Sequence, residues 1–137
     1  MIKKYIQFIN ERVNVSGHLK EEFGISYGEL SEILYHITDE FPSLEYYVED
    51  SLQSSLVEKD DNCFIVVFNH KDIDFPSQLP VLHYVEPKIF ELIRDVDAHL
   101  KEFNLYVYSS DFGENDAYYE LVISKIGHKP KDTEKRW

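Results

Sequence analysis

The sequence predicts a single α+β domain in which a mostly antiparallel sheet carries two main helices on one face. Two segments place apolar residues at helical spacing, and each is followed by two segments with the apolar pattern of strands. The 137 residues include only five Gly and five Pro, which leaves little material for low-complexity stretches. This length suits one domain, which we expect to span residues 1–126, with a basic C-terminal tail over residues 127–137.

The N-terminal region predicts a short helix followed by a loop. Apolar residues spaced for one helical face occur at Ile2, Tyr5, Ile6 and Ile9. Three glycines between residues 14 and 28 then favour a loop or a short extended piece.

The first main helix has clear start and stop signals. Ser26 and Glu29 have the spacing of a capping box, and Pro42 cannot continue a helix. The apolar residues between these signals follow the helical period: Leu30, Ile33, Leu34, Ile37 and Phe41.

A β-hairpin is predicted next. From Leu44 to Ser51, Tyr46 and Val48 alternate with Glu45, Tyr47 and Glu49, as in a strand with one solvated face. Residues 52–57 extend or re-pair this strand, and residues 59–62 form a polar turn. The run from Cys63 to Phe68 is apolar on both faces, which predicts an interior strand.

The second half predicts the same kinds of element. Residues 69–80 are predicted to form a loop and residues 81–85 a short strand, after which Glu86 and Pro87 open a helix. Its apolar face comprises Ile89, Leu92, Ile93, Val96, Leu100 and Phe103. A strand at 105–108, a turn at 111–116 and a last strand at 118–126 follow.

An internal comparison suggests a repeat. A shift of 59 residues superimposes the apolar faces of the two main helices and brings Tyr47 and Val48 onto Tyr106 and Val107. Two interpretations stay open: a tandem helix-strand-strand duplication, or a chance agreement between two amphipathic helices that each precede a hairpin.

The charge distribution is strongly acidic. The net charge is −12, and the stretch from Glu21 to Asp61 contains twelve acids and a single base, Lys59. Because binding to a nucleic-acid backbone requires a basic surface, we expect no direct nucleic-acid binding by the body of the protein. A basic protein surface is the expected partner, for example one that itself binds nucleic acid.

A surface that combines tyrosines with carboxylates is the predicted binding site. If Val48, Leu105 and Val107 point inward, their neighbours point to the other face of the sheet. Tyrosine is enriched in interfaces because it covers a large area at low entropic cost. The predicted partner surface comprises Glu45, Tyr47, Glu49, Asp50, Tyr106 and Tyr108. Packing of these rings under the N-terminal helix or the tail is the competing interpretation.

Residues suited to catalysis do not form a recognisable constellation. Cys63 lies in an apolar run without a nearby cation, which indicates a buried thiol. Because it is the single cysteine of the sequence, an internal disulfide is excluded. None of the six histidines has metal-ligand spacing. We therefore expect a non-enzymatic protein with no catalytic residue, no metal and no cofactor.

Two alternatives from other classes stay open. One is a structural or self-assembling component, in which the tyrosine face or an edge strand is buried in a homo-oligomer. The other is a small metal-dependent hydrolase that uses loop residues. Its candidate residues are His70, Asp72, Asp74, and Asp111 with Asp116.

The opening residues Lys3 to Glu11, with the sequence Lys-Lys-Tyr-Ile-Gln-Phe-Ile-Asn-Glu, resemble the start of small accessory proteins of large tailed bacteriophages. The resemblance implies a viral protein that acts in the host cytoplasm by binding a host protein, or a minor virion part. A cytoplasmic location also agrees with the single cysteine and with the lack of an apolar run long enough to span a membrane.

Overall fold

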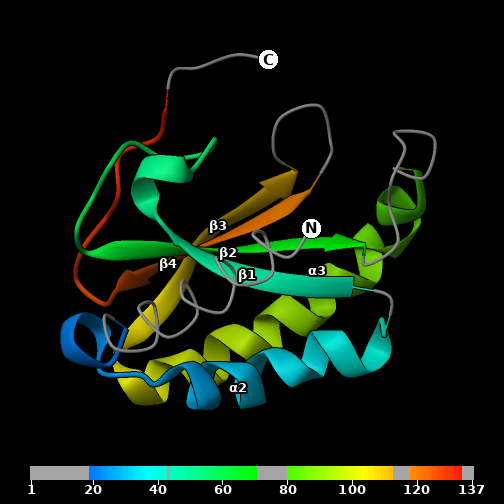
Figure 1. The fold of residues 1–137 in the computed structure, drawn as a ribbon, viewed down its shortest axis with the longest axis horizontal. Coiled ribbons are helices and arrows are strands. Elements are labelled where there is room, and N and C mark those ends of the chain that lie inside the picture. The colour runs from blue at the N-terminus through cyan, green and yellow to red at the C-terminus, as the bar shows by residue number, and fades with distance from the viewer. Residues whose placement is uncertain (1–18, 43, 71–79, 113–117, 134–137) are drawn as a thin grey trace, which may run out of the picture.

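The computed structural model describes residues 19–42, 44–70, 80–112 and 118–133. Two helices lie together on one face of a four-stranded antiparallel sheet, which confirms the predicted α+β fold (Figure 1). The helices are α2 (Tyr27–Glu40) and α3 (Pro80–Leu100). The strands are β1 (Leu44–Asp50), β2 (Cys63–His70), β3 (Leu105–Phe112) and β4 (Tyr119–Lys125), and the short 3-10 helices η1 (Ser51–Gln53) and η3 (Lys101–Phe103) follow β1 and α3.

The strand order places the most apolar strands in the centre of the sheet. The order is β1-β2-β4-β3, so β2 and β4 pair with each other and β1 and β3 form the edges. Each half of the chain therefore contributes a helix, an edge strand and a central strand, in the helix-strand-strand order that the sequence comparison predicted. Val48 and Val107, which correspond under that shift, both pack in the core beneath the helices.

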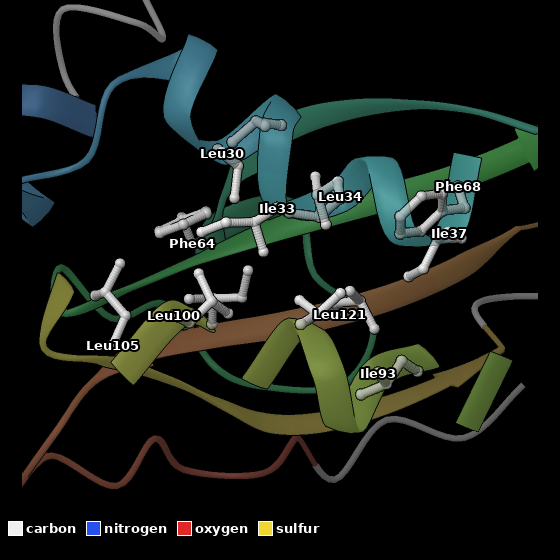
Figure 2. Packing of buried hydrophobic residues seen from close by; sticks show 14 of the residues in the cluster. Leu30, Ile33, Leu34, Ile37, Phe64, Phe68, Ile93, Leu100, Leu105 and Leu121 are labelled. Atoms are coloured by element: carbon white, nitrogen blue, oxygen red, sulfur yellow. The ribbon is translucent and has the colours of Figure 1, made fainter. Parts of the chain in front are cut away.

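The helix-covered face of the sheet, called the helix face below, contains the main core. Leu30, Ile33, Leu34 and Ile37 of α2 and Ile93, Val96 and Leu100 of α3 are buried there. They pack against inward residues of the central strands, including Phe64, Phe68 and Leu121 (Figure 2). Burial of this much apolar surface is the main stabilising contribution that the structure shows.

The start of α2 confirms the predicted capping box. The Glu29 N–H donates to Ser26 Oγ at 3.0 Å, and the Ser26 N–H donates to Glu29 Oε1 at 2.9 Å. The hydrogen bond from the Ser26 backbone is the main cause of the lowered pKa of Glu29. These bonds satisfy amide groups that the first turn of a helix leaves without partners.

The loop predicted for residues 14–28 is confirmed at residues 24–26, which are not helical, and is wrong at residues 19–23 and at the start of α2. Residues 19–23 are helical, with Leu19 and Phe23 buried in the core. Gly24 ends this turn with φ of 73°, and its N–H donates to the Lys20 carbonyl at 3.1 Å. Gly24 thus acts as a helix C-cap, which the sequence analysis interpreted only as a loop signal.

The beginning of the second main helix also differs from the prediction. Residues 81–85 were expected to form a strand, but α3 already begins at Pro80. Proline is favoured in the first turn of a helix, and Pro80 has this position instead of Pro87. The predicted N-terminal helix and most of the predicted loop at 69–80 lie outside the described residues. No helix in the described ranges is long and apolar enough to cross a membrane.

Candidate functional site on the outer face of the sheet

The face of the sheet that points away from the helices, called the outer face below, is covered by chain segments instead of helices. Its buried residues form a second, smaller cluster: Val57, Cys63, Ile65, Val67 and Val122. Tyr47, Leu56, Tyr108 and Tyr118 pack against this cluster. The connection between β1 and β2 and residues 128–133, called the C-terminal segment below, run side by side over it (Figure 1).

The structure divides the six predicted binding residues between two edges of the sheet. Tyr47 and Tyr108 pack on the outer face, as the alternation with Val48 and Val107 predicts. However, β1 and β3 are opposite edges, separated by β2 and β4. With strands spaced by about 4.8 Å, the two groups lie about 14 Å apart across the sheet.

The β1 group combines exposed acids with a half-buried phenol. Glu45 and Asp50 are exposed, and Asp50 Oδ1 accepts a hydrogen bond from the Leu52 N–H at 2.9 Å as the cap of η1. Burial raises the pKa of Tyr47 to about 12, and the nearby Glu49 carboxylate adds to this shift. Tyr47 is therefore a neutral phenol at physiological pH.

The β3 tyrosines contact the protein's own C-terminal segment. The Tyr106 hydroxyl donates to the His128 carbonyl at 2.5 Å, and the Tyr108 hydroxyl donates to Asp132 Oδ1 at 2.7 Å. The hydrogen bond to Asp132 raises the pKa of Tyr108, with a further contribution from burial. Thus these two phenols already have a binding partner within the chain.

The C-terminal segment pairs with residues 56–58 as an added piece of antiparallel strand. Val57 and Asp132 form a β-bridge. The Glu58 N–H donates to the Lys131 carbonyl at 2.8 Å, and the Thr133 N–H donates to the Leu56 carbonyl at 3.0 Å. The Lys131 ammonium also lies 3.7 Å from Glu58 Oε2.

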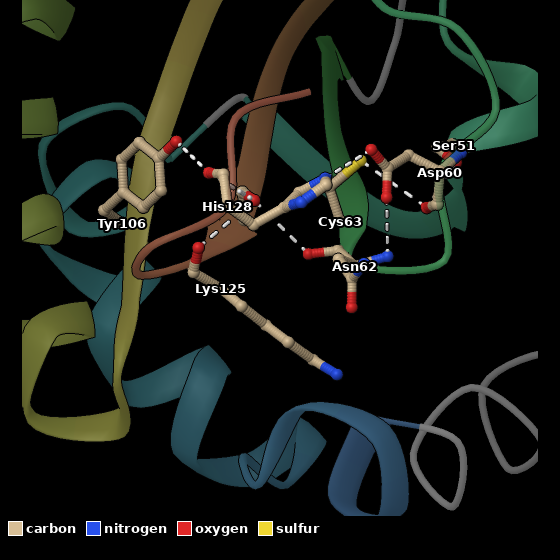
Figure 3. Close-up of polar contacts among 8 residues, drawn as sticks. Ser51, Asp60, Asn62, Cys63, Tyr106, Lys125 and His128 are labelled. Atoms are coloured by element: carbon tan, nitrogen blue, oxygen red, sulfur yellow. Dashed lines mark hydrogen bonds and ion pairs between the residues drawn. The ribbon is translucent and has the colours of Figure 1, made fainter. Parts of the chain in front are cut away.

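His128 and Asp60 form a polar centre at one end of this segment (Figure 3). His128 Nε2 lies 2.5 Å from Asp60 Oδ2. Burial alone would raise the pKa of Asp60, but hydrogen bonds from His128 and from the Asn62 N–H outweigh it, so the pKa is lowered. The Ser51 hydroxyl donates to the Asp60 carbonyl at 2.8 Å. Sequence analysis missed this pair because 68 residues separate its members.

Cys63 lies next to this polar centre without the properties of a nucleophile. Its Sγ is 3.6 Å from the Asp60 carbonyl oxygen, and the residue is buried. Burial raises the pKa of the Cys63 thiol to about 11, and the Asp60 charge contributes in the same direction. The thiol is therefore protonated at physiological pH, whereas a nucleophilic cysteine requires a lowered pKa.

A buried acid, Glu120, holds the connection between β1 and β2 at residues 54 and 55. It is 1% exposed on β4, between the apolar residues Tyr119 and Leu121. The Ser54 hydroxyl donates to its Oε1 at 3.0 Å, and the Ser55 N–H and hydroxyl donate to its Oε2. Buried carboxylates require such donors. The sequence signal was available, since Glu120 is the one acid in the apolar run 118–126.

A groove between the two helices contains further titratable side chains. The imidazole rings of His36 and His99 stack with centroids 4.9 Å apart, and Glu32 and Glu102 line the same groove of about 280 Å³. Among the described residues, no group of three or more His, Cys, Asp or Glu side chains could hold a metal ion.

The structure describes only some of the candidate residues of the hydrolase alternative. His70 ends β2, and Asp111 is exposed on the edge strand β3. Asp72, Asp74 and Asp116 lie outside the described residues.

Comparison of the chain with protein-family models, curated proteins and solved structures gives no match in any of the three.

Proposed function

We propose that the protein is a non-enzymatic binding module that docks a basic protein surface on the acidic side formed by α2 and β1. The observation that carries this proposal is the absence of Lys and Arg from both elements. The two elements expose five carboxylates: Glu32, Asp39, Glu40, Glu45 and Asp50.

An exposed aromatic side chain adds contact area to this surface. Tyr35 on α2 is 61% exposed, and its hydroxyl is hydrogen-bonded to Asp39. This hydrogen bond raises the pKa of Tyr35, which keeps the phenol neutral beside the acids. Tyrosine next to carboxylates suits a lysine or arginine side chain, because the ring packs on the aliphatic stem and the acid pairs with the charge.

Electrostatic complementarity of this kind has a measurable signature. Charged surfaces steer the encounter of two proteins, and salt screens the attraction between exposed charges. Binding should therefore weaken as ionic strength rises, and it should depend on where the acids lie as well as on the net charge.

The test compares two variants with the same change in net charge. The first reverses three acids of β1, as Glu45→Lys, Glu49→Lys and Asp50→Lys. The second reverses three exposed acids elsewhere, as Asp61→Lys, Asp95→Lys and Glu102→Lys. Binding of a fluorescent oligolysine peptide is measured by anisotropy at low and high salt.

We expect the β1 variant to bind at least about tenfold more weakly than the natural sequence, a difference of about 1.4 kcal/mol. The control variant should lose only the smaller share that follows from net charge. Binding that is indifferent to salt, or that both variants weaken equally, contradicts the proposal.

A further inference from the structure

The C-terminal segment shows which kind of chain the outer face can hold. Its backbone contributes the His128 and Lys131 carbonyls as acceptors and the Thr133 N–H as a donor. Backbone groups are present in every extended chain, so these contacts do not depend on the residues of the bound segment. Strand addition of this type is a common mode of peptide recognition.

Two polar side-chain contacts of the segment favour basic residues, and a third, from the Tyr108 hydroxyl to Asp132, requires an acceptor. On the protein body, Asp60 faces His128 and Glu58 faces Lys131, so both acids meet a side chain that carries or can carry a positive charge. The segment belongs to the most basic part of an otherwise acidic chain, which contains Lys125, Lys129, Lys131, Lys135 and Arg136. The pairing of acidic with basic side chains that the proposed function expects between this protein and a partner is therefore already present between the body and its C-terminal segment.

We propose that residues 56–58, Asp60, Tyr106 and Tyr108 form a docking surface for an extended, basic segment of a partner protein, and that residues 128–133 are its internal occupant. A partner segment must replace this occupant in order to bind. The inference rests on the proposed function for the basic chemistry of the partner. It assigns a second surface, distinct from the acidic side of α2 and β1, together with the internal segment that competes for it.

Internal occupancy has a calculable consequence. A tethered segment has a high effective concentration at its own binding surface. A competing ligand binds only to molecules in which this surface is free, so its apparent affinity is the intrinsic affinity multiplied by the fraction of such molecules. Loosening the internal segment should therefore tighten binding of the same sequence supplied from outside.

The experiment uses the full chain and a labelled peptide with the sequence of residues 127–137. His128→Ala together with Asp132→Ala removes two side-chain contacts of the internal segment and leaves Asp60, Tyr108 and residues 56–58 unchanged. The matched control, His99→Ala with Asp95→Ala, changes an exposed His and an exposed Asp on α3. Hydrogen exchange at the Glu58 amide, which the Lys131 carbonyl protects, reports whether the internal segment opens.

We expect the first variant to exchange the Glu58 amide faster and to bind the peptide about tenfold more tightly than the natural sequence, with the control unchanged. Equal peptide binding by the natural sequence and the first variant, or a Glu58 amide that exchanges no faster, overturns the inference.

The two proposals fail in different ways. The proposed function is overturned if reversal of the β1 acids leaves oligolysine binding unchanged. The peptide experiment still has a clear result in that case, because its ligand is a segment of this chain. If peptide affinity is the same with the C-terminal segment intact and loosened, only the docking surface is overturned.

Discussion

The two faces of the sheet are covered in different ways. The helix face is closed by α2 and α3, and its buried residues are almost entirely apolar. The outer face has a smaller apolar cluster and is closed by two chain segments held through Glu120, Asp60, Tyr106 and Tyr108.

The two faces therefore differ in how strongly pH and salt should affect them. Apolar burial depends little on pH or salt, whereas hydrogen bonds to charged groups depend on protonation. An intramolecular hydrogen bond also contributes only about 1 kcal/mol net, so the covering of the outer face is the part that can open without unfolding the domain. We therefore expect the helix face to determine global stability and the outer face to determine local opening.

The largest expected effect concerns the helix face. Leu34 is 0% exposed at the centre of α2, and Leu34→Ala removes its packing and leaves a cavity. We expect a loss of about 3 kcal/mol in the free energy of unfolding, measured by urea denaturation. The adjacent Tyr35 is 61% exposed, and Tyr35→Ala should change stability by less than about 0.5 kcal/mol. Similar losses for the two variants would contradict the assigned orientation of α2.

A smaller effect is expected for the buried acid of the outer face. Glu120→Gln keeps the size of the side chain but replaces an oxygen that accepts from Ser55 with a donor group. We expect a loss of about 1 to 2 kcal/mol in thermal or urea unfolding. Asp111 lies opposite Glu120 on β3 and is exposed, so Asp111→Asn is the matched control and should be near neutral. A neutral Glu120→Gln would show that the covering of Glu120 does not contribute to stability.

The smallest effect concerns Asp60 and is visible in its pH dependence. The lowered pKa of Asp60 means that its ionised form is favoured in the folded protein, mainly through His128. Its contribution is present above the ordinary aspartate pKa of about 4 and is lost as pH falls through the lowered folded value. Asp60→Asn should therefore destabilise the natural sequence at neutral pH by about 1 kcal/mol or less, because the pair is partly exposed.

The free energy of unfolding of the natural sequence and of the Asp60→Asn variant is measured from neutral pH down to about pH 3. The difference between them should shrink in acid. A difference that stays constant over this range would exclude a role for the Asp60 charge.

Much of the fold could be predicted because it follows from local patterns. The capping residues Ser26 and Glu29 mark the start of α2, and the alternation around Val48 and Val107 predicts which side chains face the helices. The helical turn at 19–23 was missed because its weak local signals are outweighed by the tertiary burial of Leu19 and Phe23. The early start of α3 was missed because Pro87 was interpreted as the first-turn proline, whereas Pro80 has that position.

The candidate site was harder to predict. The sequence indicated acids and tyrosines of the right kinds, but it placed Tyr47 and Tyr106 on one surface, whereas the strand order puts them on opposite edges. It also treated residues 127–137 as a tail, without the contacts that the structure shows for residues 128–133.

The sequence by itself determined the acidic charge, the helix-strand-strand order of each half and the facing of individual side chains, because periodicity and capping act over a few residues. Only the tertiary structure decided that His128 meets Asp60 and that Ser54 and Ser55 meet Glu120. These pairs are separated by 65 to 68 residues, and such contacts depend on strand order and on the path of the connecting segments, which no local pattern specifies.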